Sequence, residues 1–132
     1  MATIAKITLT SPDLLSDALN LEVSQTLFKA GASTDIAETT GLARYSSGAT
    51  SETKILEADD YADNKASKLY IKNTSSTRTD YVQITLGASG SSTTIGRLYG
   101  GEWAFIPWGG ASDINVIQSS ASIVLEWMLF YE

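Results

Sequence analysis

The chain has 132 residues, of which 15 are acidic and 9 basic, and it contains neither histidine nor cysteine. The absence of these two residue types excludes an imidazole base, a Ser-His-Asp triad, a thiolate nucleophile, a disulfide and any histidine or cysteine metal ligand. The net charge of −6 and the scattered basic residues do not suit a surface for nucleic acid phosphates. We therefore expect a single domain that is not an enzyme, uses no cofactor and binds no nucleic acid.

A short helix is predicted near the start of the chain, over residues 11–20. Ser11 suits the N-cap, Pro12 suits the first helical position, and Asp13 lies near the positive end of the helix dipole. One face of this helix would be apolar and would consist of Leu14, Leu15, Ala18 and Leu19.

The first 20 residues are expected to be a strand and this helix, forming a candidate arm, with Leu14 and Leu15 as candidate interface residues. The β domain would then cover residues 21–132. The stretch MATIAKITLT lacks the basic start and apolar centre of a signal peptide, so we expect synthesis in a cytoplasm. The longest apolar run near the end of the chain is far shorter than the roughly 20 residues of a membrane span, so no membrane partner is expected.

Period-two alternation of apolar and polar residues dominates the rest of the chain and predicts short β-strands. The expected strands lie within residues 19–28, 41–48, 52–61, 67–73 and 80–87. In the two clearest of them, the core-facing residues would be Leu69 and Ile71, and Val82, Ile84 and Leu86. The glycine-rich residues 87–96 are expected to form a hairpin loop.

The aromatic stretch GRLYGGEWAFIPWGG, residues 96–110, predicts a second hairpin. Gly100 and Gly101 would form a two-residue primed turn with positive φ at both positions. The resulting register places Leu98, Trp103 and Phe105 on one core-facing side.

Pro107 would end that strand, because it cannot donate a ladder hydrogen bond. Trp108, directly after it, is open to two interpretations. It is either a core or interface residue, or part of a stacking platform for sugars formed by Tyr99, Trp103 and Trp108.

The final segment, residues 120–132, is apolar on both faces of the strand that it predicts. One face would hold Ile123, Leu125, Trp127, Leu129 and Tyr131, and the other Val124, Met128 and Phe130 beside Glu126. Only one of these faces meets the core of an antiparallel sandwich, so the other needs a loop, the early helix or another subunit. The candidate interface residues of this half of the chain are Trp108, Trp127, Phe130 and Tyr131.

The acidic stretch EADDYADN, residues 57–64, contains oxygen ligands of the type that calcium prefers. Its spacing does not match an EF-hand, so we expect a solvated loop and no metal site. Taken together, about eight short strands separated by turns predict an all-β fold: an antiparallel β-sandwich or jelly roll with one short N-terminal helix.

Three segments of the chain resemble small virion structural proteins of tailed bacteriophages, notably those of marine and cyanobacterial phages. The segments are SKLYIKNTSS, IGRLYGGEWAFIPWGGASDINV and LEWMLFYE. Positions that follow the pattern of that family are Gly101, Glu102, Pro107, Trp108 and Tyr131.

The resemblance implies a structural protein of the virion, and most specifically a capsid decoration or cement protein. Such a protein would be a homotrimer that binds the phage major capsid protein and stabilises the mature head. A protein associated with the tail, baseplate or fibre is the alternative within the virion. A carbohydrate-binding β-sandwich module is the alternative from another class.

Overall fold

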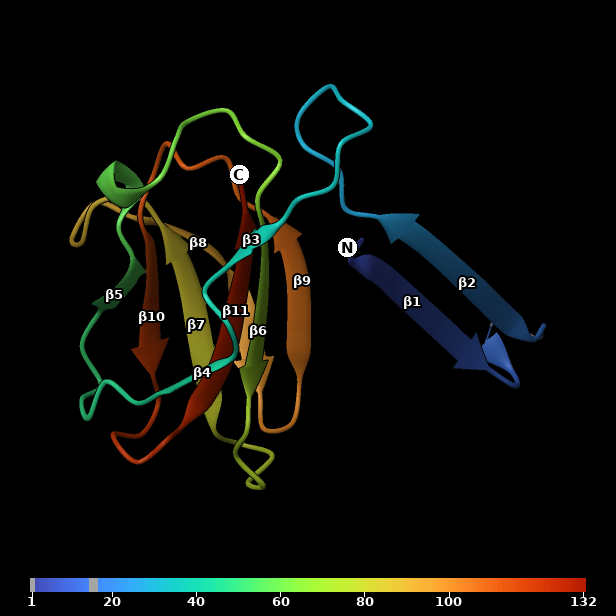
Figure 1. The fold of residues 1–132 in the computed structure, drawn as a ribbon. Coiled ribbons are helices and arrows are strands. Elements are labelled where there is room, and N and C mark those ends of the chain that lie inside the picture. The colour runs from blue at the N-terminus through green and yellow to red at the C-terminus, as the bar shows by residue number, and fades with distance from the viewer. Residues whose placement is uncertain (1, 15–16) are drawn as a thin grey trace. The chain divides into compact units, whose positions relative to one another are not determined.

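The computed structural model of the chain describes residues 2–14 and 17–132, which fall into two units. The first unit covers residues 1–37 and the second residues 38–132. The first is a β-hairpin with a following loop, and the second is a β-sandwich (Figure 1). The expected boundary at residue 20 falls inside the hairpin, so the sandwich begins later in the chain than the sequence suggested.

In the first unit, strand β1 (Ile4–Ser11) pairs with β2 (Leu19–Thr26) in an antiparallel register. The predicted helix is therefore wrong, because Ser11 ends β1 and Leu19 begins β2. A tight turn follows β1, with the Asp17 amide donating to the Leu14 carbonyl oxygen at 3.1 Å. Isolated short helices are marginal in water, whereas the alternating residues on either side of the turn pair along the full length of both strands.

The second unit is built from two antiparallel sheets, which confirms the predicted all-β sandwich. In spatial order, the four-stranded sheet contains β5 (Thr53–Leu56), β10 (Ile114–Gln118), β7 (Tyr81–Leu86) and β8 (Thr93–Tyr99). The five-stranded sheet contains β3 (Glu38–Thr39), β11 (Leu125–Tyr131), β6 (Lys68–Asn73) and β9 (Trp103–Pro107), with β4 (Ala43–Tyr45) also paired to β11. A 3₁₀ turn, η2 (Ala58–Asp60), follows β5.

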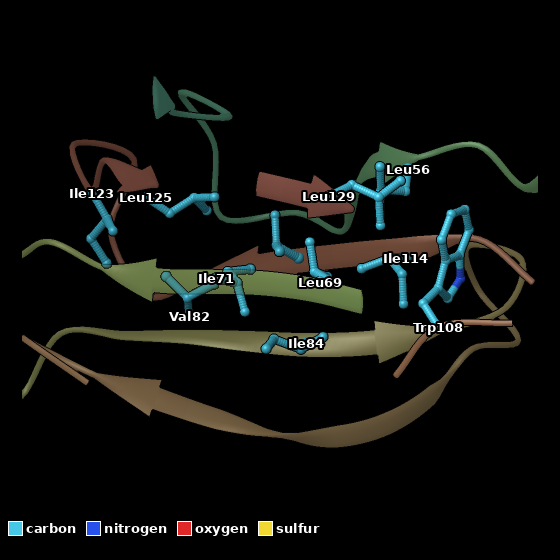
Figure 2. Close-up of a cluster of buried hydrophobic side chains, with 11 residues drawn as sticks. Leu56, Leu69, Ile71, Val82, Ile84, Trp108, Ile114, Ile123, Leu125 and Leu129 are labelled. Atoms are coloured by element: carbon cyan, nitrogen blue, oxygen red, sulfur yellow. The ribbon is translucent and has the colours of Figure 1, made fainter. Parts of the chain in front are cut away.

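The core lies between these two sheets, which contribute inward side chains from alternate positions (Figure 2). Leu69, Ile71, Val82 and Ile84 are buried, as the alternation predicted. The other members of the buried cluster are Leu56, Trp108, Ile114, Val116, Ile123, Leu125 and Leu129. The core therefore draws on strands that are far apart in the sequence.

Leu86 differs from the expectation, because 37% of its surface is exposed, while Thr85 beside it is buried. Leu86 nevertheless keeps the core side of the sheet, because β7 pairs regularly with β10 and places Leu86 opposite the buried Ile114. It is exposed because it lines an open pocket at the end of the sandwich, together with Ile106 and Trp108. Residues 87–92 then form the predicted hairpin loop between β7 and β8.

The turn at Gly100 and Gly101 does not form the predicted hairpin. The Glu102 amide donates to the Tyr99 carbonyl oxygen at 2.9 Å, but of the two glycines only Gly101 has a positive φ, 87°. This is the pattern of a type II turn, which splays the flanking strands instead of matching their twist. Accordingly β8 pairs with β7, and β9 pairs with β6 in the other sheet.

The loop after β7 is held by the carboxylate of Glu52. This carboxylate accepts hydrogen bonds from the hydroxyls of Ser92 and Thr85 and from the Gly90 amide. These three bonds, in that order of effect, lower the pKa of Glu52 from 4.5 to about 2. The charged carboxylate therefore links the beginning of β5 to the β7–β8 loop.

We expect the stability from Glu52 to be fully present above pH 4.5 and to be lost as the pH falls through about 2, because its pKa is lower in the folded than in the unfolded chain. Glu52→Gln should therefore be less stable than the wild type at neutral pH, and the difference should shrink towards pH 2. Urea unfolding midpoints of both proteins across this range measure it. A difference independent of pH would contradict the role of the charge.

Candidate interaction surfaces

The outward side of the five-stranded sheet carries a group of large apolar side chains. In β6 and β9 the core-facing residues are Leu69, Ile71, Ala104 and Ile106, so the residues between them point outwards. The strand register then aligns the outward residues in adjacent positions. We call this group the outer aromatic face, and it consists of Tyr70, Trp103, Phe105, Met128 and Phe130.

Contacts across strands shape this face. The rings of Phe105 and Phe130 meet edge to face, with centroids 6.5 Å apart. Tyr70 lies between Phe105 and Met128 in the register, and burial, followed by the charge of Glu126, raises its pKa. Trp103 is 52% exposed. Trp103 is therefore open to solvent, whereas Tyr70, Phe105, Met128 and Phe130 are partly buried by their neighbours in the sheet.

The outer aromatic face is flanked by basic side chains in an otherwise acidic chain. Lys72 lies opposite Trp103 in the register, and Glu126 lies between Lys72 and Arg44. Lys68 lies opposite Phe130 and donates to the Ala66 carbonyl oxygen at 2.7 Å. A second acidic residue, Glu132, accepts from the Ala66 amide at 3.1 Å. With three basic and two acidic residues, the sign of the charge here is opposite to that of the whole chain, −6.

The hairpin of the first unit also has one apolar side, because directly paired residues of β1 and β2 share a face. Leu9 and Val23 on this side are 48% and 51% exposed. The opposite side is polar and carries an ion pair between Lys6 and Glu22 at 3.1 Å. We call the apolar side the hairpin's aliphatic face, and it consists of Ala5, Ile7, Leu9, Leu19, Leu21 and Val23.

Trp108 belongs to the core and not to an interface. Its side chain is only 3% exposed, its Nε1 donates to the Ser112 carbonyl oxygen at 2.8 Å, and Tyr61 meets its ring edge to face at 5.2 Å. Trp103 was predicted to face the core, and this is wrong, because its side chain lies on the outer side of the five-stranded sheet. Both corrections follow from the pairing of β9 with β6, which turns Ala104 and Ile106 inwards.

The sugar-stacking platform expected from three aromatic residues does not form. Tyr99 pairs with Tyr81 on the outer side of the four-stranded sheet, where the two rings are 5.8 Å apart. Trp103 lies on the outer side of the other sheet, and Trp108 is buried. The three rings therefore share no surface.

The remaining candidate interface residues are divided between inside and outside. Trp127 and Tyr131 point inwards and pack against the core, so the interface prediction is wrong for the side of β11 that they occupy. Phe130 points outwards as part of the outer aromatic face. Leu14 is half exposed in the turn of the hairpin, whereas Leu15 lies outside the described residues.

The acidic loop is occupied by its own hydrogen bonds and ion pairs. Lys54 bridges the carboxylates of Asp113 and Glu57, which, in that order of effect, raise its pKa. Asp113 accepts from the Ala58 amide at 2.8 Å, and this bond, followed by that to Lys54, lowers its pKa. Within residues 2–14 and 17–132, no group of three acidic side chains is arranged to hold a metal ion.

No protein-family model, no curated protein and no solved structure matches this chain. In the part that the structure describes, no helix is long and apolar enough to cross a membrane. The fold itself defines the class, an antiparallel β-sandwich preceded by a β-hairpin. Sequence reasoning missed the outer aromatic face, although the alternation of Tyr70 with Leu69 and Ile71 already placed one aromatic ring opposite the core.

Proposed function

We propose that this chain is a non-enzymatic structural protein of a tailed-phage virion, and specifically a decoration protein that binds the major capsid protein and stabilises the mature head. The observation that carries the proposal is the outer aromatic face, an apolar surface with a basic border on an acidic chain. Soluble monomers seldom leave so many large apolar side chains together on the surface. The resemblance of the three sequence segments to virion proteins supplies the class of assembly.

The mechanism is a linkage between binding and stability. A protein that binds the expanded lattice of the head more tightly than the precursor or the free subunits stabilises the expanded state. No catalytic group is required for this. The acidic chain repels the packaged genome, and a homotrimer places three copies of each weak contact on the lattice, so that their affinities reinforce one another. Its location is then the virion, after assembly in the host cytoplasm.

Co-sedimentation with isolated heads tests this proposal. The purified chain should sediment with expanded, tailless heads of the phage that encodes it, and much less with unexpanded precursor heads. Trp103→Glu should weaken the binding at least tenfold, because a charge on the outer aromatic face separates the copies whose combined contacts hold the protein on the lattice. Gln83→Glu, which adds the same charge to the outer side of the four-stranded sheet, should bind like the wild type.

Other outcomes would overturn the proposal. Binding to isolated tails and not to heads would assign the chain to the tail, baseplate or fibre instead. Quenching of tryptophan fluorescence by glycans, abolished in Trp103→Ala, would favour a carbohydrate-binding module. Equal binding to expanded and precursor heads would contradict the stabilising mechanism.

A further inference from the structure

The hairpin's aliphatic face requires a cover that the hairpin itself does not supply. A two-stranded sheet is only marginally stable in water without further packing. Its polar side needs no further packing, because it is solvated and Lys6 and Glu22 form an ion pair there. Its apolar side leaves Leu9, Leu21 and Val23 between 43% and 51% exposed.

The charges of the described residues indicate which surface fits. The turn between β1 and β2 contains Asp13 and Asp17 and no basic residue. The outer aromatic face is bordered by Arg44, Lys68 and Lys72 and by two acidic residues, Glu126 beside Lys72 and Glu132 beside Ala66, so its border is basic on balance. Packing two outer aromatic faces against each other would bring basic borders together, whereas a hairpin on this face joins opposite charges.

The dimensions of the two faces also agree. Each strand of the hairpin has eight residues, about 27 Å, whereas β6, at the centre of the outer aromatic face, has six, about 20 Å. The hairpin is therefore long enough to cover the full length of the face. Aliphatic side chains on one sheet and aromatic side chains on the other suit face-to-face packing of sheets about 10 Å apart.

We propose that the hairpin's aliphatic face of one copy packs on the outer aromatic face of a second copy of this chain. Copies are then joined by exchanged hairpins, and each copy offers one hairpin and accepts another. The inference rests on the self-association in the proposed function and names the two surfaces that carry it. It needs no contact with a capsid.

Thiol crosslinking of the full chain tests the arrangement, because the sequence contains no cysteine of its own. Leu9→Cys places a thiol in the centre of the hairpin's aliphatic face, and Tyr70→Cys places one in the centre of the outer aromatic face. One of these variants is labelled with ¹⁵N, and the two are mixed with a short bifunctional thiol reagent. Mass spectrometry should then find the mixed adduct as the main product. Thr10→Cys, whose side chain lies on the polar side of the same strand, should give at least tenfold less mixed adduct.

The other products would overturn the inference. If the main adduct joins two copies of Leu9→Cys, two hairpins pack together. If the main adduct joins two copies of Tyr70→Cys, two outer aromatic faces pack together. A chain that carries both Leu9→Cys and Tyr70→Cys provides a further check. An intrachain crosslink as its main product would mean that each chain covers its own face. Absence of crosslinks would mean that neither face is covered by this chain.

Light scattering on the same purified protein provides a second measurement. The wild type should have a mass of at least two chains, and Leu9→Glu a mass of one chain, without loss of the sandwich fold by circular dichroism. A single-chain mass for the wild type would also overturn the inference. Both experiments use the chain alone, so their failure is distinct from a failure to bind heads.

Discussion

Asn73→Ala should lower the free energy of unfolding by about 3–5 kcal/mol. Asn73 is the last residue of β6 and is fully buried. Its Nδ2 donates to the carbonyl oxygens of Asp80 and Leu98 at 3.2 and 3.0 Å, and its Oδ1 accepts from the Ser75 amide at 3.0 Å. Alanine removes all three bonds at once, and it leaves three partly buried backbone groups without this partner.

Asn115→Ala provides a matched comparison for this prediction. Asn115 is equally buried, but its Nδ2 makes one hydrogen bond, to the Gly87 carbonyl oxygen at 2.7 Å, and its Oδ1 has no partner among the described residues. Its loss should therefore cost only about 1 kcal/mol. Urea unfolding of the two variants measures the difference. Equal losses would show that the hydrogen bonds of Asn73 are not the cause.

Gly110→Ala should lower the free energy of unfolding by about 3 kcal/mol, for two reasons that add. Gly110 has a φ of 80°, which side-chain-bearing residues rarely adopt. A Cβ at this position would also lie 2.5 Å from the backbone oxygen of Ala62. Because a Cβ is fixed to its own backbone and the Ala62 oxygen is itself a backbone atom, the clash is relieved only by moving a loop away from the corner that holds Trp108.

Gly109→Ala is the control, one residue earlier in the same corner. A Cβ at Gly109 would have no atom within 4 Å, and the φ of Gly109 is not in the left-handed region. This substitution should change stability by less than about 1 kcal/mol. Unfolding followed by tryptophan fluorescence reports on both variants, because the corner surrounds Trp108. A similar loss in Gly109→Ala would indicate that the corner tolerates no side chain at all.

Local alternation was a reliable guide to strands and to their inward residues wherever one face was clearly polar. It placed Leu69, Ile71, Val82 and Ile84 in the core, where the structure has them. It also gave the side that Leu86 faces, opposite the buried Ile114, but not its 37% exposure, because Leu86 lines an open pocket at the end of the sandwich. Alternation predicts the side that a residue faces, whereas its exposure depends on what packs over that side.

Trp103 was predicted to face the core and lies outside, while Trp108, for which the sequence left a core position open, is buried. The reason for the error at Trp103 is the turn at Gly100 and Gly101. Two adjacent glycines allow both a primed turn and a type II turn, and these send the following strand in different directions. The loop that contains Thr77 lies against Gly100. A Cβ on Gly100 would clash with the backbone oxygen of Thr77. The choice was therefore made by tertiary packing.

In the first unit, local sequence signals favoured a helix where the structure has the end of a strand and a turn. Ser11, Pro12 and Asp13 are good signals for a helix start, yet they lie at the end of β1 and in the turn after it. The alternation of Leu19, Leu21 and Val23 was recognised, but its partner strand was not paired with it in the prediction. A capping signal is local and weak, whereas a full-length strand pairing outweighs it.

The sequence by itself determined the β class of this protein, the inward residues of its regular strands and the lack of histidine and cysteine chemistry, because these depend on residue type and short-range period. Only the tertiary structure decided which strands share a sheet, and with them the burial of Trp108 and the exposure of Trp103. Strand pairing joins residues far apart in the chain, and many pairings satisfy the same local pattern. The outer aromatic face exists only after that choice, since it is assembled from β6, β9 and β11.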